Sequence, residues 1–175
     1  EQLRLLLNKH LARFEIRLRA SLSKHVALSL GPHGYLDTTY FRPSTNHEEL
    51  LQRLFKSVAD SHEVFVKHYV GKYTYPALPP IWASVELLSF GQLSKWFAAL
   101  ADADIRTRIS HDLGLPTEQA AVGTIQSLVY VRNICPHHGR LWNRALVKRP
   151  PILKRIRNSL NLDPENPSQS ENLNL

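Results

Sequence analysis

Residues 117–144 read TEQAAVGTIQSLVYVRNICPHHGRLWNR, a long helical pattern that ends in a crowd of polar side chains. Thr117 is a residue type that caps helix N-termini, and Glu118 suits a first turn, where it faces the positive end of the helix dipole. Apolar residues then recur at helical spacing; they are Ile125, Leu128, Val129 and Val131. Pro136 cannot donate to the carbonyl of Arg132, so the helix kinks or restarts there.

The chain before this stretch carries further helical patterns. Residues 1–30 have apolar side chains at three- and four-residue steps, and Gly31-Pro32-His33-Gly34 ends this helix. Ser44, Thr45 or Asn46 caps a second helix, which continues to about Val70. A third helix is predicted over residues 81–100 and a fourth over residues 102–113, where Gly114 ends it. The predicted core of the third helix consists of Trp82, Val85, Leu88, Leu93, Trp96 and Phe97.

Two residues of the third predicted helix do not follow its apolar pattern. Glu86 is either exposed or a partly buried carboxylate that pairs with an arginine. Gly91 weakens a helix, so it predicts a close crossing with another helix. Beyond the opening stretch, residues 141–160 form a basic helical pattern that Pro150 and Pro151 interrupt. With no convincing strand pair, the chain is predicted to be an all-α antiparallel bundle in one domain, residues 1–160, followed by a disordered polar tail, residues 161–175.

Composition sets the broad class. The 175 residues carry a net charge of +7, which suggests a polyanionic partner such as nucleic acid. The single cysteine fits a reducing, cytoplasmic compartment, and the chain has no apolar run long enough to span a membrane. The chain does not begin with methionine, so the N-terminal portion of a longer protein is expected to precede it.

Residues 132–144 concentrate the side chains that could carry chemistry. Asn133, His137, Arg140 and Arg144 are spaced by four, three and four residues, so they share one face if the helix is only kinked. That face has an imidazole and guanidinium groups but no carboxylate, which suits a phosphodiester. RNA supplies its own nucleophile, the 2′-hydroxyl, and histidine exchanges protons near neutral pH. No metal or other cofactor is expected, because Cys135, His137 and His138 are too crowded for a tetrahedral zinc site.

Several assignments stay open at this point. His138 is either a second proton carrier or a surface neighbour of His137. The x4 spacing from Arg132 favours His137 as the main proton carrier. Arg140 and Arg144 either bind RNA or pair with an acidic residue such as Glu86. Cys135 is interpreted as a packing residue rather than a nucleophile. Other residues with a structural interpretation are His68, Tyr69 and Trp142, and the arginines of residues 1–30 are interpreted as a solvated face in preference to an RNA contact.

The block from Arg132 to Arg144 resembles the signature of the Abi-like proteins, the AbiD and AbiF group of abortive-infection defence. Arg132-x4-His137 also resembles the R-x4-6-H signature of the HEPN superfamily of helical ribonucleases. Upstream blocks similar to the Abi-like family are Glu63-x4-His68-Tyr69, Pro80-x-Trp82 and Glu86-Leu-Leu-Ser-Phe-Gly91-x-Leu-Ser. The resemblance covers about residues 40–148 and extends only generically to the first helix.

This resemblance implies a HEPN-type bundle that acts as a metal-independent endoribonuclease in phage defence. It implies a homodimer with a composite site, in which Arg132 and His137 carry catalysis and Asn133 orients them or the phosphate. Arg140, Asn143 and Arg144 would bind RNA, and Glu86 would support the site. By analogy, a small regulatory RNA is a further partner, as in a toxin–antitoxin pair. Two other functions remain in view, a non-catalytic RNA-binding module and a protein-interaction subunit.

Overall fold

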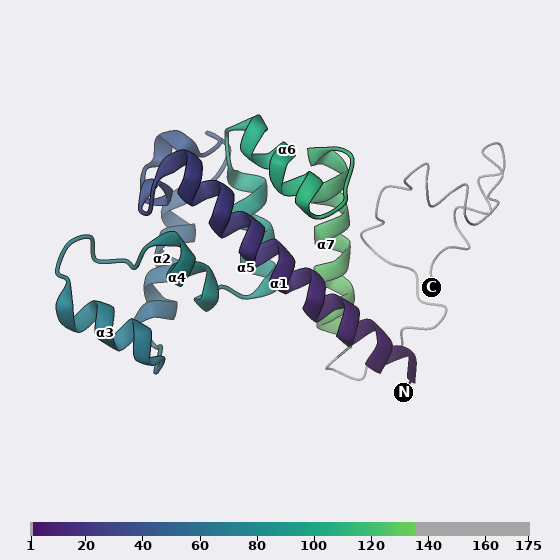
Figure 1. Ribbon diagram of the computed structural model, residues 1–175, viewed down its shortest axis with the longest axis horizontal. Helices are drawn as coiled ribbons and strands as arrows, with labels where there is room; N and C mark the ends of the chain where they lie inside the picture. Colours follow the sequence, from purple (N-terminus) through teal and green to yellow (C-terminus); the bar gives the residue numbers. More distant parts are fainter. Residues whose placement is uncertain (1, 136–175) are drawn as a thin grey trace.

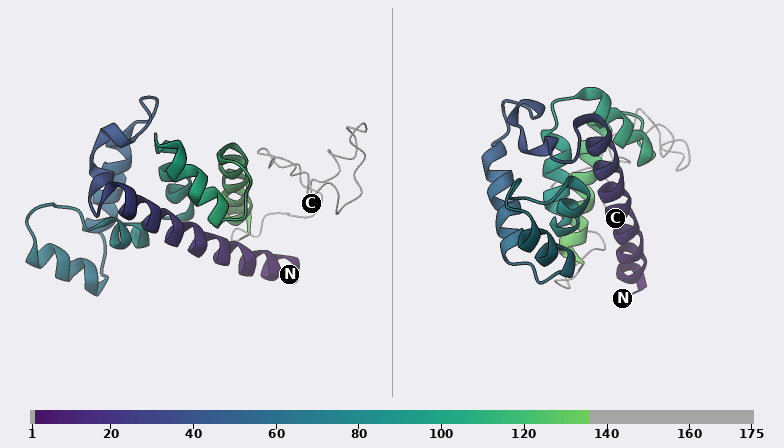
Figure 2. Two further views of the ribbon diagram at one scale, coloured as in Figure 1. Left: turned by 45° about the horizontal axis from the view of Figure 1, so that its top comes forward. Right: turned by 60° about the vertical axis from the view of Figure 1, so that its left-hand side comes forward.

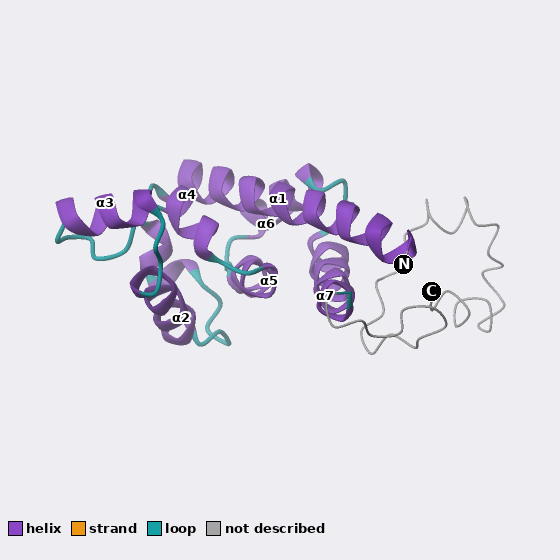
Figure 3. Ribbon diagram, turned by 90° about the horizontal axis from the view of Figure 1, so that it is seen from below, coloured by secondary structure: helices purple, strands orange, loops and turns teal. Residues whose placement is uncertain are grey.

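In a computed structural model, residues 2–135 are described, and every regular element in this part of the chain is a helix (Figure 1, Figure 3). The α-helices are α1 Gln2–Leu30, α2 His47–Ala59, α3 Val64–Lys72, α4 Ile81–Ser84, α5 Phe90–Ala99, α6 Ala103–Asp112 and α7 Glu118–Ile134. Three short 3-10 helices join them, η1 Gly34–Leu36, η2 Thr38–Tyr40 and η3 Val85–Leu87. The prediction of an all-α bundle is confirmed.

The predicted helix boundaries are correct where a glycine or a capping side chain sets them. Gly31 and Gly114 follow α1 and α6 with φ angles of 79° and 76°, a left-handed conformation that glycine adopts without steric cost. The Asn46 side chain accepts a hydrogen bond from the Glu49 amide at the start of α2. The Thr117 hydroxyl does the same for the Ala120 amide at the start of α7.

The sequence predicted two long continuous helices, and both predictions are wrong because each stretch is interrupted. The pattern that was expected to reach Val70 breaks between α2 and α3, where Glu63 is extended. The helix expected over residues 81–100 breaks at Leu88, and Ser89 starts α5 with a capping box to Gln92. Trp82 was expected in the core but is 53% exposed on the short α4.

The core forms where α1 lies across α4, α5, α6 and α7 (Figure 1). Its fully buried side chains include Leu18, Leu22, Tyr35, Phe90, Phe97 and Ile109. A Cβ atom at Gly91, in the first turn of α5, would lie 3.7 Å from Val129 of α7, so Gly91 does mark a helix crossing. At the other end of this pair, Arg106 binds both the carbonyl of Leu100 and the carboxylate of Glu118, so α5 and α7 run antiparallel.

The α2–α3 region extends to the end of the molecule opposite the N-terminus of α1 (Figure 2). Tyr69 of α3 holds the proline-rich connection, since its hydroxyl donates to the Pro76 carbonyl at 2.8 Å. This contact confirms the structural interpretation of Tyr69, whereas His68 is exposed. None of the helices in residues 2–135 is both long and apolar enough to cross a membrane.

Candidate functional site

The C-terminal end of α7, where the block of polar residues begins, is anchored on α1. Ile134 and Cys135 are 8% and 3% exposed and pack in a small apolar cluster with Leu11. Leu7, Leu128, Tyr130 and Val131 pack against this cluster. The Cys135 amide also donates to the Val131 carbonyl at 3.1 Å, which continues the helical hydrogen bonding past Ile134. This end of α7 therefore has a defined position relative to α1.

Cys135 is a packing residue in this arrangement. Burial raises the pKa of its thiol, and the smaller opposing influence of Arg4 does not offset that rise. A raised pKa and a buried sulfur both disfavour the thiolate, which is the nucleophilic form. The structure thus agrees with the packing interpretation of Cys135.

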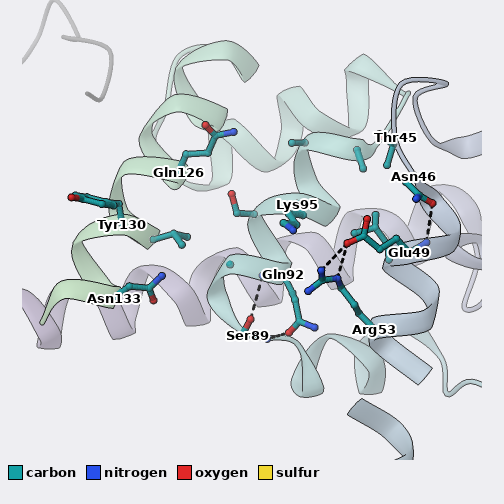
Figure 4. Close-up of a pocket in the computed structure, with 16 residues that line it drawn as sticks. Thr45, Asn46, Glu49, Arg53, Ser89, Gln92, Lys95, Gln126, Tyr130 and Asn133 are labelled. Atoms are coloured by element: carbon teal, nitrogen blue, oxygen red, sulfur yellow. Dashed lines mark hydrogen bonds and ion pairs between the residues drawn. The ribbon is translucent and has the colours of Figure 1, made fainter. Parts of the chain in front are cut away.

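Arg132 and Asn133 are exposed between these buried anchors. Since neighbouring residues are about 100° apart around a helix, their side chains leave α7 in different directions. Asn133 shares one side of α7 with Gln126 and Tyr130, at spacings of four and three residues (Figure 4). Arg132 does not line that side, and within residues 2–135 its side chain has no hydrogen bond or ion pair. The two residues predicted to act together thus face different parts of the surface.

The side of α7 that carries Asn133 faces an open groove of about 770 Å³. Helices α2, α5 and α7 form its walls, and Lys95 of α5 lies in the middle of the close-up (Figure 4). The polar residues that line it are Thr45, Asn46, Glu49, Arg53, Ser89, Gln92, Ser94, Lys95, Gln126, Tyr130 and Asn133. The remaining lining is apolar or small, and a concave surface that combines apolar lining with polar groups is the usual setting of a binding site.

The charged side chains that line the groove are two cations, Arg53 and Lys95, and one carboxylate, Glu49. Arg53 lies 2.7 Å from the Glu49 carboxylate through one nitrogen, and its Nε donates to the same oxygen at 2.9 Å, so these two charges offset each other. Lys95 is exposed, and no carboxylate of residues 2–135 pairs with it. The groove therefore presents one uncompensated positive charge, on Lys95, and the amide of Asn133 lines the same groove, a combination that suits an anionic group.

Glu86 lies away from this groove. It stands on η3, with its side chain 56% exposed and 3.9 Å from the Nε atom of Arg19 on α1. Arg19 also pairs with Glu15 at 3.1 Å and donates to the Leu88 carbonyl at 3.0 Å. Glu86 thus belongs to a contact between α1 and the α4–α5 connection. It was predicted to support the site, but it contacts neither Arg132 nor Asn133.

The other predicted site residues, His137, His138, Arg140, Asn143 and Arg144, lie outside the described residues. So do the proline hinge at Pro136 and the predicted helix and tail beyond it. Among residues 2–135, no three histidine, cysteine, aspartate or glutamate side chains gather as metal ligands would.

Sequence reasoning did not anticipate the groove, although part of it had a visible signal. Gln126, Tyr130 and Asn133 are spaced as one helix face, so the polar side of α7 could have been extended backwards from Asn133. Lys95 and Arg53 gave no such signal. They meet α7 only through the packing of α2 and α5, which brings together residues far apart in the sequence.

Residues 1–143 match the model of the family described as Abi-like protein. The chain belongs to the Abi-like protein family. The match includes α1, to which the resemblance seen in the sequence motifs extended only generically. It reaches Asn143, one residue before the end of the block that begins at Arg132. Membership links this Abi-like chain to abortive-infection defence. No curated protein and no solved structure matches it significantly.

Proposed function

We propose that the chain is a metal-independent endoribonuclease of HEPN type, which acts in abortive infection by cutting RNA. Arg132 and His137 are the proposed catalytic residues, and Asn133 orients them or the scissile phosphate. The observation that carries the proposal is the end of α7, where Arg132 and Asn133 are exposed while Ile134 and Cys135 anchor the backbone beneath them. The family match over residues 1–143 supports it further.

The proposed reaction uses only groups that protein and RNA supply. A histidine accepts the proton of the 2′-hydroxyl, and the 2′-oxygen attacks the adjacent phosphorus. The bond from phosphorus to the 5′-oxygen breaks, and a second histidine donates a proton to that leaving oxygen. Arg132 stabilises the extra negative charge of the phosphorane through its planar pair of donors. The products are a 2′,3′-cyclic phosphate and a 5′-hydroxyl end.

The need for both a base and an acid leads to a proposed homodimer. One chain carries a single Arg132–His137 block, although His138 is an alternative second proton carrier. Two blocks facing each other across a twofold axis would supply two imidazoles and two guanidiniums to one phosphate. Arg140, Asn143 and Arg144 would then hold the RNA on either side of the cut.

The first experiment measures cleavage of a 5′-labelled mixed-sequence RNA in the presence of EDTA. We expect cleavage by the purified chain, with 2′,3′-cyclic phosphate ends, and its loss in His137→Ala. A matched control is Arg108→Ala, which removes an exposed arginine of α6 that has no ion pair within residues 2–135. That control should cleave like the unaltered chain.

The outcomes separate the functions still in view. Cleavage that survives in His137→Ala contradicts the site assignment. Salt-sensitive RNA binding without any cleavage indicates the non-catalytic RNA-binding module, because phosphate contacts weaken as ionic strength rises. Absence of both indicates the protein-interaction subunit. Cleavage by a strictly monomeric protein, measured by light scattering at the assay concentration, contradicts the composite site.

A further inference from the structure

The positive charge of the described residues is concentrated on one helix. Helix α1 carries six lysines and arginines against a single glutamate, Glu15. Residues 31–135 carry nine lysines and arginines against ten aspartates and glutamates, so the rest of this region is close to neutral. A charge excess confined to one helix is a local feature that a basic composition does not by itself produce, and it marks α1 as a candidate surface for a polyanion.

Most of this charge lies along one exposed side of α1. Lys9, Arg13 and Arg17 follow one another at steps of four residues, and all three are exposed. Each step turns the direction of the side chain by about 40°, so the three span about 80° of the helix circumference. Lys24 falls in the same range of directions. We call Lys9, Arg13 and Arg17 the α1 basic stripe.

The stripe differs from the other cations of α1 in its partners. Arg19 points into the protein, where it binds Glu15 and backbone carbonyls. Lys24 lies 3.6 Å from Asp112 of α6. In contrast, no carboxylate among residues 2–135 pairs with Lys9, Arg13 or Arg17. These three charges therefore have no structural use in this part of the chain and face the surroundings.

The stripe begins at the level of the candidate site but on the outer side of α1. Lys9 is two residues before Leu11, which packs against Ile134 and Cys135 at the end of α7. Two residues correspond to about 200° around a helix, so the stripe faces away from this contact. From there α1 continues along the outside of the molecule (Figure 3). Steps of four residues correspond to a rise of about 6 Å each, so the stripe presents three charges over roughly 12 Å. An extended single strand can place successive phosphates along such a line.

We infer that the α1 basic stripe binds the phosphate backbone of single-stranded RNA along the outer side of α1, starting at the level of the end of α7. The inference takes RNA as the ligand from the proposed function, but it does not depend on cleavage. It assigns to α1 a binding surface in addition to the block that begins at Arg132. Backbone contacts of this kind carry no sequence information, so the surface contributes affinity and direction rather than base specificity.

An anionic membrane is the other polyanion that a basic helix could meet, and the packing of α1 argues against it. A membrane-surface helix needs a continuous apolar face free to enter the bilayer. The apolar face of α1 is used within the protein, since Leu11, Leu18 and Leu22 are buried. Its exposed apolar residues, such as Leu5 and Ile16, are scattered among charged ones.

The test compares RNA binding by two variants that have the same reduction in charge. The first is Lys9→Gln/Arg13→Gln/Arg17→Gln. The matched control is Lys56→Gln/Lys67→Gln/Arg108→Gln, which removes three exposed cations from α2, α3 and α6. Both are made in the full chain carrying His137→Ala, so that cleavage does not consume the probe. Binding of a fluorescent 20-nucleotide single-stranded RNA is measured by anisotropy from low to high salt, after circular dichroism has shown equal melting temperatures.

We expect the stripe variant to lower the slope of log affinity against log salt by about 2, because each neutralised phosphate contributes roughly 0.7 to that slope. The control should keep the slope of the His137→Ala parent. Equal slopes in the stripe variant and its parent, or an equal reduction in the control, overturn the inference. So does a stripe variant that no longer binds anionic phospholipid vesicles while it keeps RNA binding. A chain that cleaves no RNA but shows the expected slopes overturns the proposed catalysis alone.

The charge-conserving variant Lys9→Arg/Arg13→Lys/Arg17→Lys separates charge from packing. Because phosphate contacts at an exposed helix face depend mainly on charge, it should bind with the slope of the parent. If it binds as weakly as the glutamine variant, the effect arises from altered packing of α1 and the inference is wrong.

Discussion

The two ends of α7 hold arginines in opposite environments. Near its start, Arg106 of α6 is 4% exposed, its Nε donates to Glu118 at 2.6 Å, and its Nη1 donates to the carbonyls of Leu100 and Ala101. At its end, Arg132 is exposed and has no partner among residues 2–135. Arg106 joins α5, α6 and α7. Arg132 is exposed at the end of α7 and makes no side-chain contact that stabilises the described part of the chain.

Burial and hydrogen bonding separate structural from functional arginines in a basic chain. A guanidinium that is buried and fully hydrogen-bonded contributes to stability, and its removal leaves other groups unsatisfied. An exposed guanidinium on an anchored helix end contributes little to stability but is free to contact a ligand. Arg106 gave no signal in the sequence, whereas Arg132 was singled out by the block that it begins. Variants with the reverse effects on stability and cleavage would contradict this separation.

The largest effect is expected for Arg106→Ala. Its removal leaves two carbonyls and one oxygen of Glu118 without the donor that they share, while the other Glu118 oxygen keeps its contact with Gln119 at 3.3 Å. We expect a decrease of about 3 kcal/mol in the free energy of unfolding. Urea unfolding followed by circular dichroism measures it. The control Arg108→Ala, on the exposed side of the same helix, should change stability by less than about 0.5 kcal/mol. A decrease below about 1 kcal/mol for Arg106→Ala would show that this buried pair is replaceable.

The opposite pattern is expected for Arg132→Ala. Removing one donor to a transition-state oxyanion typically slows a reaction by about 100-fold or more, so RNA cleavage should fall by at least that factor. Stability should stay within about 0.5 kcal/mol of the unaltered chain, as for other exposed residues. Single-turnover cleavage in EDTA and urea unfolding are measured on the same preparation. A destabilised variant with normal cleavage would place Arg132 among the structural arginines.

The sequence predicted those features that depend on local chemistry. Gly31 and Gly114 end helices because their backbone requires a positive φ, and Thr117 starts α7 because its hydroxyl satisfies a free amide. The break at Ser89 was missed although its capping box with Gln92 is a local signature. The apolar pattern continued through the break, since Val85, Leu88 and Leu93 are buried on both sides of it.

The candidate site was predictable only along α7. The block from Arg132 indicated a phosphodiester ligand from residue types and spacing, and its resemblance to the Abi-like proteins agrees with the family match. The groove beside Asn133 required knowledge of tertiary packing, because Arg53 and Lys95 approach α7 from two other helices. Likewise, the exposure of Trp82 reflects the position of the short α4 rather than any feature of its own sequence.

Cys135 tests whether the end of α7 is held by packing alone. Cys135→Ala removes a buried sulfur from the cluster with Leu11 and Ile134, and we expect a cost of about 1 kcal/mol in stability. Cleavage should remain within about twofold, because the thiol has no place in the proposed reaction. Reaction of the native thiol with a disulfide reagent near neutral pH should be slower than in urea, since burial raises its pKa. Rapid labelling of the folded protein, together with loss of cleavage in Cys135→Ala, would show that Cys135 is a functional thiol rather than a packing residue.

The smallest effect is expected at Asp112, an intermediate case between the two arginines. Its carboxylate accepts hydrogen bonds from His25 at 2.8 Å and Ser21 at 2.9 Å, yet 37% of the side chain is exposed. The hydrogen bond from His25, followed by that from Ser21, lowers the pKa of Asp112. A carboxyl group whose pKa is lower in the folded state stabilises the protein above its unfolded pKa, about 3.9, and that contribution disappears as the pH falls through the folded value.

Urea midpoints from pH 6 down to pH 2 would therefore fall more in the unaltered chain than in Asp112→Asn. Because the group is partly exposed to solvent, the difference should amount to about 1 kcal/mol or less. Lys24→Gln, which removes the more distant cation of the cluster, should leave the acid-dependent part almost unchanged. Parallel pH profiles for the unaltered chain and Asp112→Asn would mean that the α1–α6 contact depends on packing, as the end of α7 does at Cys135, and that its ion pair adds nothing.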